Sequence, residues 1–537
     1  MPKRLLLGNE AVAQGAIDAG LHNAYAYPGT PSTELPEYLA RIAAAAGSGL
    51  RFHWAANEKT ALEEALGASY AGHRALAAMK HVGLNVAADA FLNAAIAGVN
   101  AGLIVVVGDD PSMHSSQNEQ DSRLYAAMAM VPCLEPSTQQ EAYEMPRVAF
   151  ELSERLRAPV LLRLTTRLAH SRADVTLGDR QSVEPRRVAN DRKQFILLPV
   201  NARGSYRRLV EAQGERVRAS EESPFNILQD GPDTSLGIIA CGIAQNYVLE
   251  AFAGPPPHPF LKLSQYPLPV ALLEKMLARC PRVLVVEDGY PHVERALRGT
   301  PPRTDVKIAG RLSGDLPRTG ELTPGALRRA LAIEALPERL APTLPVPRPP
   351  ALCAGCPHAD SFLALNAALA SFPDARVFSD IGCYTLGALP PYESIDTCLD
   401  MGASVTMAKG AADTGLRPAV AVIGDSTFTH SGMTGLLDCV DGGTPVTVLV
   451  LDNATVAMTG GQPSLAEDRL TGILAGLGVP ADHLRLLDPR PAEHDANVRI
   501  LEDELRYDGL SVVVSRRECI QTARRRPRGG DGSSEAR

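Results

Sequence analysis

Short apolar runs alternate with helix-like stretches along most of this chain. Each run is a nearly continuous set of apolar residues, which is typical of a buried strand, and the clearest runs lie at 102–107, 236–240, 282–286, 419–423 and 446–451. Stretches rich in small residues at 60–71 and 86–101 are expected to be core helices that pack closely against a sheet. Strands that alternate with helices in this way predict an α/β protein.

Two breaks divide the pattern into three α/β units. Residues from about 176 to 230 are polar and weakly patterned, which suggests a long connector with a few helices. Six prolines lie between Pro337 and Pro350, and such a density can continue neither a helix nor a central strand. The expected organisation is therefore domains at 1–175, 231–335 and 352–522, a connector at 176–230, a Pro-rich linker at 336–351 and a disordered tail at 523–537.

Composition narrows the class of protein. A chain of 537 residues is too long for one core, and 45% apolar with 21% charged residues is ordinary for a globular protein. The net charge of −8 argues against nucleic acid as a partner, and the basic run at 524–528 is expected to be a solvated terminus. Because neither a membrane-spanning stretch nor a signal peptide is visible, we expect a cytoplasmic protein with its nine cysteines reduced.

Polar residues follow two of the predicted strands near the end of the chain. Gly424-Asp425-Ser426 comes after the run at 419–423, and Asn453 comes after the run at 446–451. Ligands gather at the carboxyl ends of parallel strands, and oxygen ligands of this kind suit a Mg²⁺ ion that also binds a diphosphate. The alternative is an ordinary strand-to-helix turn, because Gly-Asp-Ser also caps helices well.

A carboxylate in the first domain could complete such a site. Glu58 lies at a loop-to-helix junction in Asn57-Glu58-Lys59. A buried glutamate could share a proton with the aminopyrimidine of thiamine diphosphate, whereas an exposed one would only support the helix N-terminus. The residues alone favour the second interpretation.

Six ordered motifs resemble those of a known family. They cover the chain from about Leu5 to about Ala523, and they are Tyr27-Pro28-Gly29-Thr30-Pro31-Ser32-Thr33-Glu34, Asn57-Glu58-Lys59, Met79 to Asn85, Asp109 to Asp121, Cys356-Pro357-His358 and Gly424-Asp425-Ser426 through Gln462. The chain is similar in these motifs to the large subunit of indolepyruvate:ferredoxin oxidoreductase. The resemblance implies three doubly wound α/β domains in the order pyrimidine-binding, transketolase C-terminal-like and diphosphate-binding.

The resemblance also implies roles for individual residues. Glu58 becomes the carboxylate that activates the cofactor, and Thr30 faces the substrate carbonyl. Mg²⁺ is held by Asp425, Asn453 and the carbonyl of Thr455, and the cofactor is bound in addition by Gly402, Gly424 and Ser426. The same cleft is expected to be lined by His114, Ser115, Gln117 and Asn118. Lys80 and His81 could equally contact the pocket or make structural hydrogen bonds.

Four cysteines match a cluster arrangement in related 2-oxoacid:ferredoxin oxidoreductases. Those enzymes hold one [4Fe-4S] cluster beside the thiamine, and the matching residues here are Cys353, Cys356, Cys383 and Cys519. Zinc suits the same ligands, and four unligated thiols are a further alternative. The other five cysteines show no comparable spacing and are expected to be buried small apolar residues.

The resemblance thus implies oxidative decarboxylation of an aryl 2-oxo acid such as indolepyruvate to an acyl-CoA. Electrons would pass through the cluster to a ferredoxin, and the large subunit would pair with a small subunit and form a dimer with its own copy. The family's usual C-terminal ferredoxin-like cysteine runs are not seen here, which favours a non-oxidative decarboxylase that gives an aldehyde, while the four cysteines oppose that alternative. A non-catalytic scaffold subunit is the third alternative.

Overall fold

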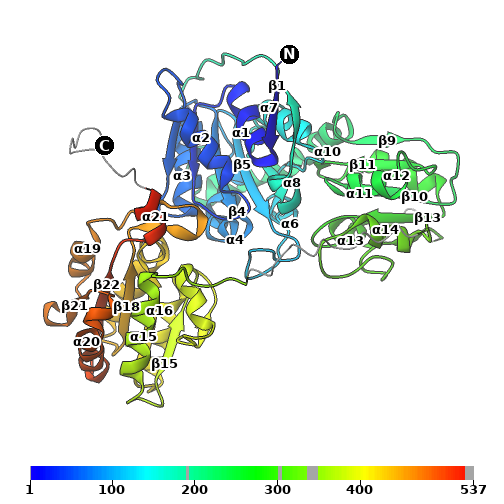
Figure 1. Cartoon of the computed structure of the whole chain (residues 1–537). Coiled ribbons are helices and arrows are strands. Elements are labelled where there is room, and N and C mark those ends of the chain that lie inside the picture. The colour runs from blue at the N-terminus through cyan, green and yellow to red at the C-terminus, as the bar shows by residue number, and fades with distance from the viewer. Residues whose placement is uncertain (1, 189–192, 300–304, 335–348, 526–537) are drawn as a thin grey trace. The chain divides into compact units, whose positions relative to one another are not determined.

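The computed structural model describes residues 2–188, 193–299, 305–334 and 349–525 (Figure 1). The chain forms two compact units, residues 1–340 and 341–537, and each is described by itself. Most of the predicted Pro-rich linker and of the predicted tail lies outside the described residues. The first residues of that tail, 523–525, end helix α21 (Ile520–Arg525).

The first sheet of unit 1 has seven strands in the order β12-β6-β7-β5-β4-β2-β3. All neighbours are parallel except β12, which pairs antiparallel with β6. The strands are β2 (Asn23–Ala26), β3 (Arg51–Trp54), β4 (Ala75–Lys80), β5 (Leu103–Asp109), β6 (Cys133–Leu134), β7 (Val160–Thr165) and β12 (Gln265–Tyr266). A separate antiparallel pair is formed by β1 (Lys3–Leu7) and β8 (Arg172–Thr176).

Helices cover both faces of this sheet. Alternate residues of β4 and β5 point into two different hydrophobic clusters, as the pleat of a strand requires. One cluster contains α1 (Gly8–Asp18), α2 (Glu34–Ala43) and α7 (Gln139–Leu156), and the other contains α3 (Glu58–Tyr70), α4 (His81–Val86), α5 (Ala88–Ala97) and α6 (Arg123–Ala129). The helices expected from the small-residue stretches are thus confirmed.

The second sheet of unit 1 is drawn in green in Figure 1 and has the order β14-β13-β10-β11-β9. Its strands are β9 (Ile227–Gln229), β10 (Gly237–Cys241), β11 (Phe260–Leu263), β13 (Arg282–Val286) and β14 (Lys307–Ala309), and only β9 is antiparallel. It is accompanied by α11 (Ala244–Ala251), α12 (Val270–Arg279), α13 (His292–Gly299) and α14 (Pro324–Ala330). Both hydrophobic clusters of the first sheet continue into this second sheet.

Two strands belong to a different sheet from the one that the expected domain boundaries would give them. β9 falls within the predicted connector, which also forms α9 (Pro199–Glu211) and α10 (Gln213–Glu221), yet it is an edge strand of the second sheet. β12 falls within the predicted 231–335 domain, yet it completes the first sheet. The boundaries at 175 and 230 stay predictions.

Unit 2 contains one parallel sheet of six strands in the order β16-β15-β17-β18-β22-β21. The strands are β15 (Arg376–Ser379), β16 (Thr397–Cys398), β17 (Ala419–Gly424), β18 (Thr447–Asp452), β21 (Leu484–Leu487) and β22 (Ser511–Arg516). One face carries α16 (Ala403–Asp413), α18 (Met433–Asp441) and α19 (Leu470–Gly476), and the other carries α15 (Pro357–Leu369) and α20 (His494–Arg506).

The predicted fold class is confirmed, because the three large sheets among the described residues are mainly parallel and flanked by helices. Two short antiparallel pairs accompany them, β1 with β8 and β19 (Thr455–Val456) with β20 (Gln462–Pro463). No helix within the described ranges is long and apolar enough to cross a membrane. The cytoplasmic location stays a prediction.

Candidate functional site

The site residues predicted in unit 1 lie at one edge of the first sheet. The neighbouring strands β3, β2, β4 and β5 are parallel, so their carboxyl ends meet at that edge. Thr30 follows β2, Glu58 follows β3, and Lys80 is the last residue of β4. The segment 110–121, which we call the pocket loop, follows β5.

Glu58 is buried, with 5% of its surface exposed. It is the first residue of α3, whose start is set by Asn57, because the Asn57 Oδ1 accepts a hydrogen bond from the Thr60 backbone N–H at 2.9 Å. Gly83 of α4 packs directly on the carboxylate, since a Cβ at Gly83 would lie 2.4 Å from Glu58 Oε1. The exposed alternative for Glu58 is therefore wrong.

Lys80 and His81 both hold the pocket loop through its backbone. The Lys80 Nζ donates to the carbonyl of Ser115 at 2.7 Å, and burial lowers the pKa of Lys80 to about 8. The ring nitrogens of His81 lie 3.3 Å from the carbonyl oxygen of Gly108 and 3.2 Å from that of Asn118. These contacts support the alternative in which both side chains make structural hydrogen bonds.

The other predicted pocket residues differ in exposure. His114, Ser115 and Gln117 are exposed, while Thr30 and Asn118 are half-buried. Nε2 of His114 lies 3.3 Å from Glu321 Oε2, so the loop also touches the chain beyond the second sheet. The Oδ1 of Asn118 is buried and has no hydrogen-bond partner within the described part of the chain.

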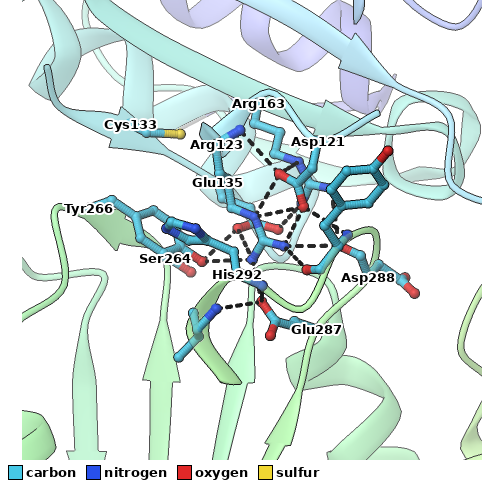
Figure 2. Close-up of polar contacts among 12 residues, drawn as sticks. Asp121, Arg123, Cys133, Glu135, Arg163, Ser264, Tyr266, Glu287, Asp288 and His292 are labelled. Atoms are coloured by element: carbon cyan, nitrogen blue, oxygen red, sulfur yellow. Dashed lines mark hydrogen bonds and ion pairs between the residues drawn. The ribbon is translucent and has the colours of Figure 1, made fainter. Parts of the chain in front are cut away.

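A network of buried charges lies where the pocket loop ends. Figure 2 shows Arg123 and Arg163 surrounded by carboxylates from both sheets of unit 1. Arg123 Nη2 donates to Asp121 Oδ2 at 2.5 Å, and Arg163 Nε donates to Asp109 Oδ2 at 2.6 Å. The sequence analysis missed this network, because its members come from strands and turns far apart in the chain.

The network ties the pocket loop to the turn after β13. The backbone N–H of Tyr290 donates to Asp121 Oδ2 at 3.0 Å, and the Tyr290 hydroxyl donates to the carbonyl of Glu119 at 3.1 Å. Burial raises the pKa of Glu287. Burial would also raise the pKa of Asp121, but the charges of Arg123 and Arg163 outweigh it and hold the pKa of that carboxyl well below its usual range. We conclude that the second sheet helps to position the pocket loop.

Replacing Arg163 by Met should destabilise unit 1 strongly. The change leaves the carboxylate of Asp109 buried without its arginine and takes one of two arginines from Glu135, which typically costs about 3–5 kcal/mol. Denaturant unfolding can be followed by the fluorescence of Trp54, the single tryptophan of the chain. Arg279→Met, which removes an exposed pair with Asp230, is the control and should cost less than about 1 kcal/mol. Equal stability of the two variants would contradict the structural role of the network.

The site residues predicted in unit 2 also gather at the carboxyl ends of adjacent parallel strands. Asp425 directly follows β17 and begins the short helix α17 (Asp425–Thr427), and Asn453 follows β18. Asp425 is 2% exposed, and burial raises its pKa to about 7. Among the described residues, neither its Oδ2 nor the hydroxyl oxygen of Ser426 has a hydrogen-bond partner, although both are buried. A buried carboxylate oxygen in this condition is suited to a cation.

The amide of Asn453 has a defined orientation. Its Oδ1 accepts from the backbone N–H of Thr455 at 3.2 Å, and its Nδ2 lies 3.2 Å from Nε2 of His358. His358 is buried in the first turn of α15, and this burial lowers its pKa to about 4. The imidazole is therefore neutral near pH 7.

Asp380 is a further buried carboxylate at this edge, and the sequence analysis did not find it. It follows β15, and its Oδ2 accepts from the Ser404 hydroxyl at 2.5 Å and from the Gly402 backbone N–H at 3.1 Å. Gly402 precedes α16 with φ 93°, a conformation that favours glycine, and a Cβ there would lie 2.7 Å from Cβ of Ser431. Burial raises the pKa of Asp380 to about 6.

The four predicted cluster cysteines influence one another electrostatically. Burial, together with the thiol groups of Cys356, Cys519 and Cys353, raises the pKa of Cys383 to about 12. Burial raises the pKa of Cys356, which precedes α15, although the backbone N–H groups of His358 and Ala359 act to lower it. In the described ranges, however, no three His, Cys, Asp or Glu side chains form a set close enough to hold a single metal ion.

Two domain models match the chain. "Pyruvate flavodoxin/ferredoxin oxidoreductase, thiamine diP-bdg" covers residues 14–221, and "Thiamine pyrophosphate enzyme, C-terminal TPP binding domain" covers residues 380–485. The first includes Glu58 and the pocket loop, and the second includes Asp380, Asp425 and Asn453.

Curated relatives cover nearly the whole chain. The indolepyruvate oxidoreductase subunit IorA of Methanothermobacter thermautotrophicus is 40% identical over 99% of this chain and 89% of its own length. The chain belongs to the IorA family. The IorA of Methanothermobacter marburgensis is 41% identical over 96% of this chain and 86% of its own length. A 2-oxoglutarate synthase subunit KorA of Methanothermobacter thermautotrophicus is 30% identical over 34% of this chain and 49% of its own length.

Membership in the IorA family confirms the recognised resemblance. The chain is an enzyme subunit of the thiamine diphosphate-dependent 2-oxoacid oxidoreductases, and both of its matched domain models are thiamine diphosphate-binding domains.

Proposed function

We propose that this chain is the large subunit of an enzyme that oxidatively decarboxylates an aryl 2-oxo acid of the indolepyruvate type to an acyl-CoA. The observation that carries the proposal is the buried Oδ2 of Asp425 at a parallel-strand end, which has no hydrogen-bond partner among the described residues. The chain that holds it is 40% identical to an indolepyruvate oxidoreductase subunit. Thiamine diphosphate, when bound, supplies the electron sink for decarboxylation.

Asp425, Asn453 and the carbonyl of Thr455 would hold the Mg²⁺ ion that binds the diphosphate. The residues fit this role, because Asp425 offers a buried oxygen that no described residue hydrogen-bonds, and Asn453 Oδ1 keeps a second lone pair beside its bond from Thr455. Gly402, Gly424 and Ser426 would contact the diphosphate. Ser426 supports this assignment with a buried hydroxyl oxygen that has no partner in the described structure.

Glu58 would exchange a proton with the aminopyrimidine and so activate the cofactor. Its burial and the close approach of Gly83 support the role, because both exclude water from the carboxylate. Thr30 would face the substrate carbonyl. The exposed loop residues His114, Ser115 and Gln117, with half-buried Asn118, would contact the substrate.

Cys353, Cys356, Cys383 and Cys519 would hold one [4Fe-4S] cluster. Burial and, after it, the thiols of the other three cysteines raise the pKa of Cys383, and this electrostatic effect supports a shared site. Four sulfurs around one zinc ion would each lie about 2.3 Å from it. Zinc held by the same four thiolates stays the alternative to the cluster.

We further propose that the chain works with a small partner subunit and passes electrons to a ferredoxin. Dimerisation between copies of the large subunit is part of this proposal. The pairing with a partner subunit is supported by the relatives, which are named as subunits of an oxidoreductase.

The test is an oxygen-free assay of the purified complex loaded with thiamine diphosphate and Mg²⁺. Indolepyruvate, phenylpyruvate, hydroxyphenylpyruvate and a branched 2-oxo acid are each supplied with a one-electron dye, with and without CoA. We expect the dye to be reduced fastest with an aryl substrate, and only when CoA is present. An aldehyde formed without any electron acceptor would instead establish the non-oxidative decarboxylase.

A further inference from the structure

His358 lies between two groups of proposed ligands. Its ring contacts the proposed metal ligand Asn453, while its backbone N–H acts to lower the pKa of the Cys356 thiol. The side chain is 3% exposed, and the ring of Tyr384 meets it edge-on with centroids 6.3 Å apart. Neither the proposed metal site nor the proposed cluster uses the imidazole, although Cys356-Pro357-His358 is one of the six motifs.

The surroundings of Asn453 determine which end of its amide faces each neighbour. On one side the backbone N–H of Thr455 can only donate, so it requires the amide oxygen. On the other side the Asn453 Nδ2 can only donate, so Nε2 of His358 must accept. When the ring holds the tautomer with Nε2 unprotonated, the rotated amide is disfavoured, because it would bring Oδ1 against a second acceptor.

Mg²⁺ binds oxygen ligands, so the rotated amide would not coordinate it. We propose that His358 is the positioning residue that keeps the amide oxygen of Asn453 directed at the Mg²⁺ ion of thiamine diphosphate. This inference rests on the proposed function, because it takes Asn453 as a metal ligand. Partners that orient metal ligands in this way typically change metal affinity by about 10–100-fold when they are replaced.

The first test measures metal and cofactor affinity without relying on turnover. The full-length chain, purified without oxygen together with its partner subunit, is titrated with Mg²⁺ at saturating thiamine diphosphate in a calorimeter. His358→Phe fills the space but cannot accept a hydrogen bond, so Mg²⁺ should bind about 10–100-fold more weakly. His358→Gln retains an acceptor oxygen and should stay within about threefold of the unchanged protein.

Iron content provides the matched control. Both variants keep the backbone N–H of residue 358 that acts on the Cys356 thiol, so they should contain as much iron as the unchanged protein. Unaltered Mg²⁺ affinity in His358→Phe would overturn the inference. If His358→Phe does not fold, a loss of at least about tenfold in a folded His358→Gln would overturn it as well, because that variant keeps the acceptor.

A double-mutant cycle separates positioning from a general packing role. If His358 acts through Asn453, the His358→Phe change should cost no further Mg²⁺ affinity in an Asn453→Ala background. Additive losses would overturn the inference but leave the proposed function standing. An unchanged protein that binds thiamine diphosphate equally well with and without Mg²⁺ would instead refute the metal site itself.

Discussion

Replacing Glu58 by Gln should lower kcat by about 10²–10⁴-fold, because glutamine cannot exchange the proton that activates the cofactor. The fold should be retained, since Asn57 still caps α3 and the amide has nearly the size of the carboxyl group. The measurement is reduction of a one-electron dye by the complex at saturating thiamine diphosphate, with circular dichroism to check the fold.

Two further variants sharpen this prediction. Glu63→Gln removes an exposed carboxylate of the same helix, which pairs with Lys59, and should leave kcat unchanged. Gly83→Ala should lower kcat while Glu58 itself is retained, because the new Cβ would displace the carboxylate. Full activity in Glu58→Gln would remove its assigned role.

Replacing Cys383 by Ala should abolish electron transfer to the dye. A cluster that loses one of four thiolate ligands is expected to be lost or changed in type, so iron and sulfide content should fall together with the electron paramagnetic resonance signal of the reduced protein. The control is Cys398→Ser, which removes a half-buried thiol of the same unit that lies outside the predicted set.

The same experiment decides among the alternatives for the four cysteines. Zinc in place of iron, in protein purified without oxygen, would contradict the proposed cluster. Normal dye reduction in Cys383→Ala would show that electrons leave the cofactor by another route.

The strand-end residues were the most predictable part of the site. Asp425 and Asn453 could be placed at one sheet edge because each comes two residues after the end of a continuous apolar run, and parallel strands bring such positions together. Glu58 was harder, because its sequence neighbours alone favoured a simple helix start. Its burial depends on Gly83, which comes from a different helix.

The buried network could not be predicted for a physical reason. Arg163 lies within a β-strand and Asp121 at the end of a loop, and either residue alone would be expected on the surface. Only the structure, in which the two sheets of unit 1 lie together, shows that the charges of Arg163 and Asp121 compensate each other. His358 and Asp380 were missed similarly, since His358 Nε2 and Asn453 Nδ2 meet across 95 positions of sequence.

The position of β12 has a consequence for how the chain is made. The seven-stranded sheet of unit 1 remains incomplete until Gln265 and Tyr266 have left the ribosome, because these residues form its last edge strand. Until then β6 presents an unpaired edge, which is a known risk for aggregation during synthesis. A gene fragment that stops near residue 230 would preserve this vulnerable state permanently, so chaperone dependence should be greatest for nascent chains of about that length.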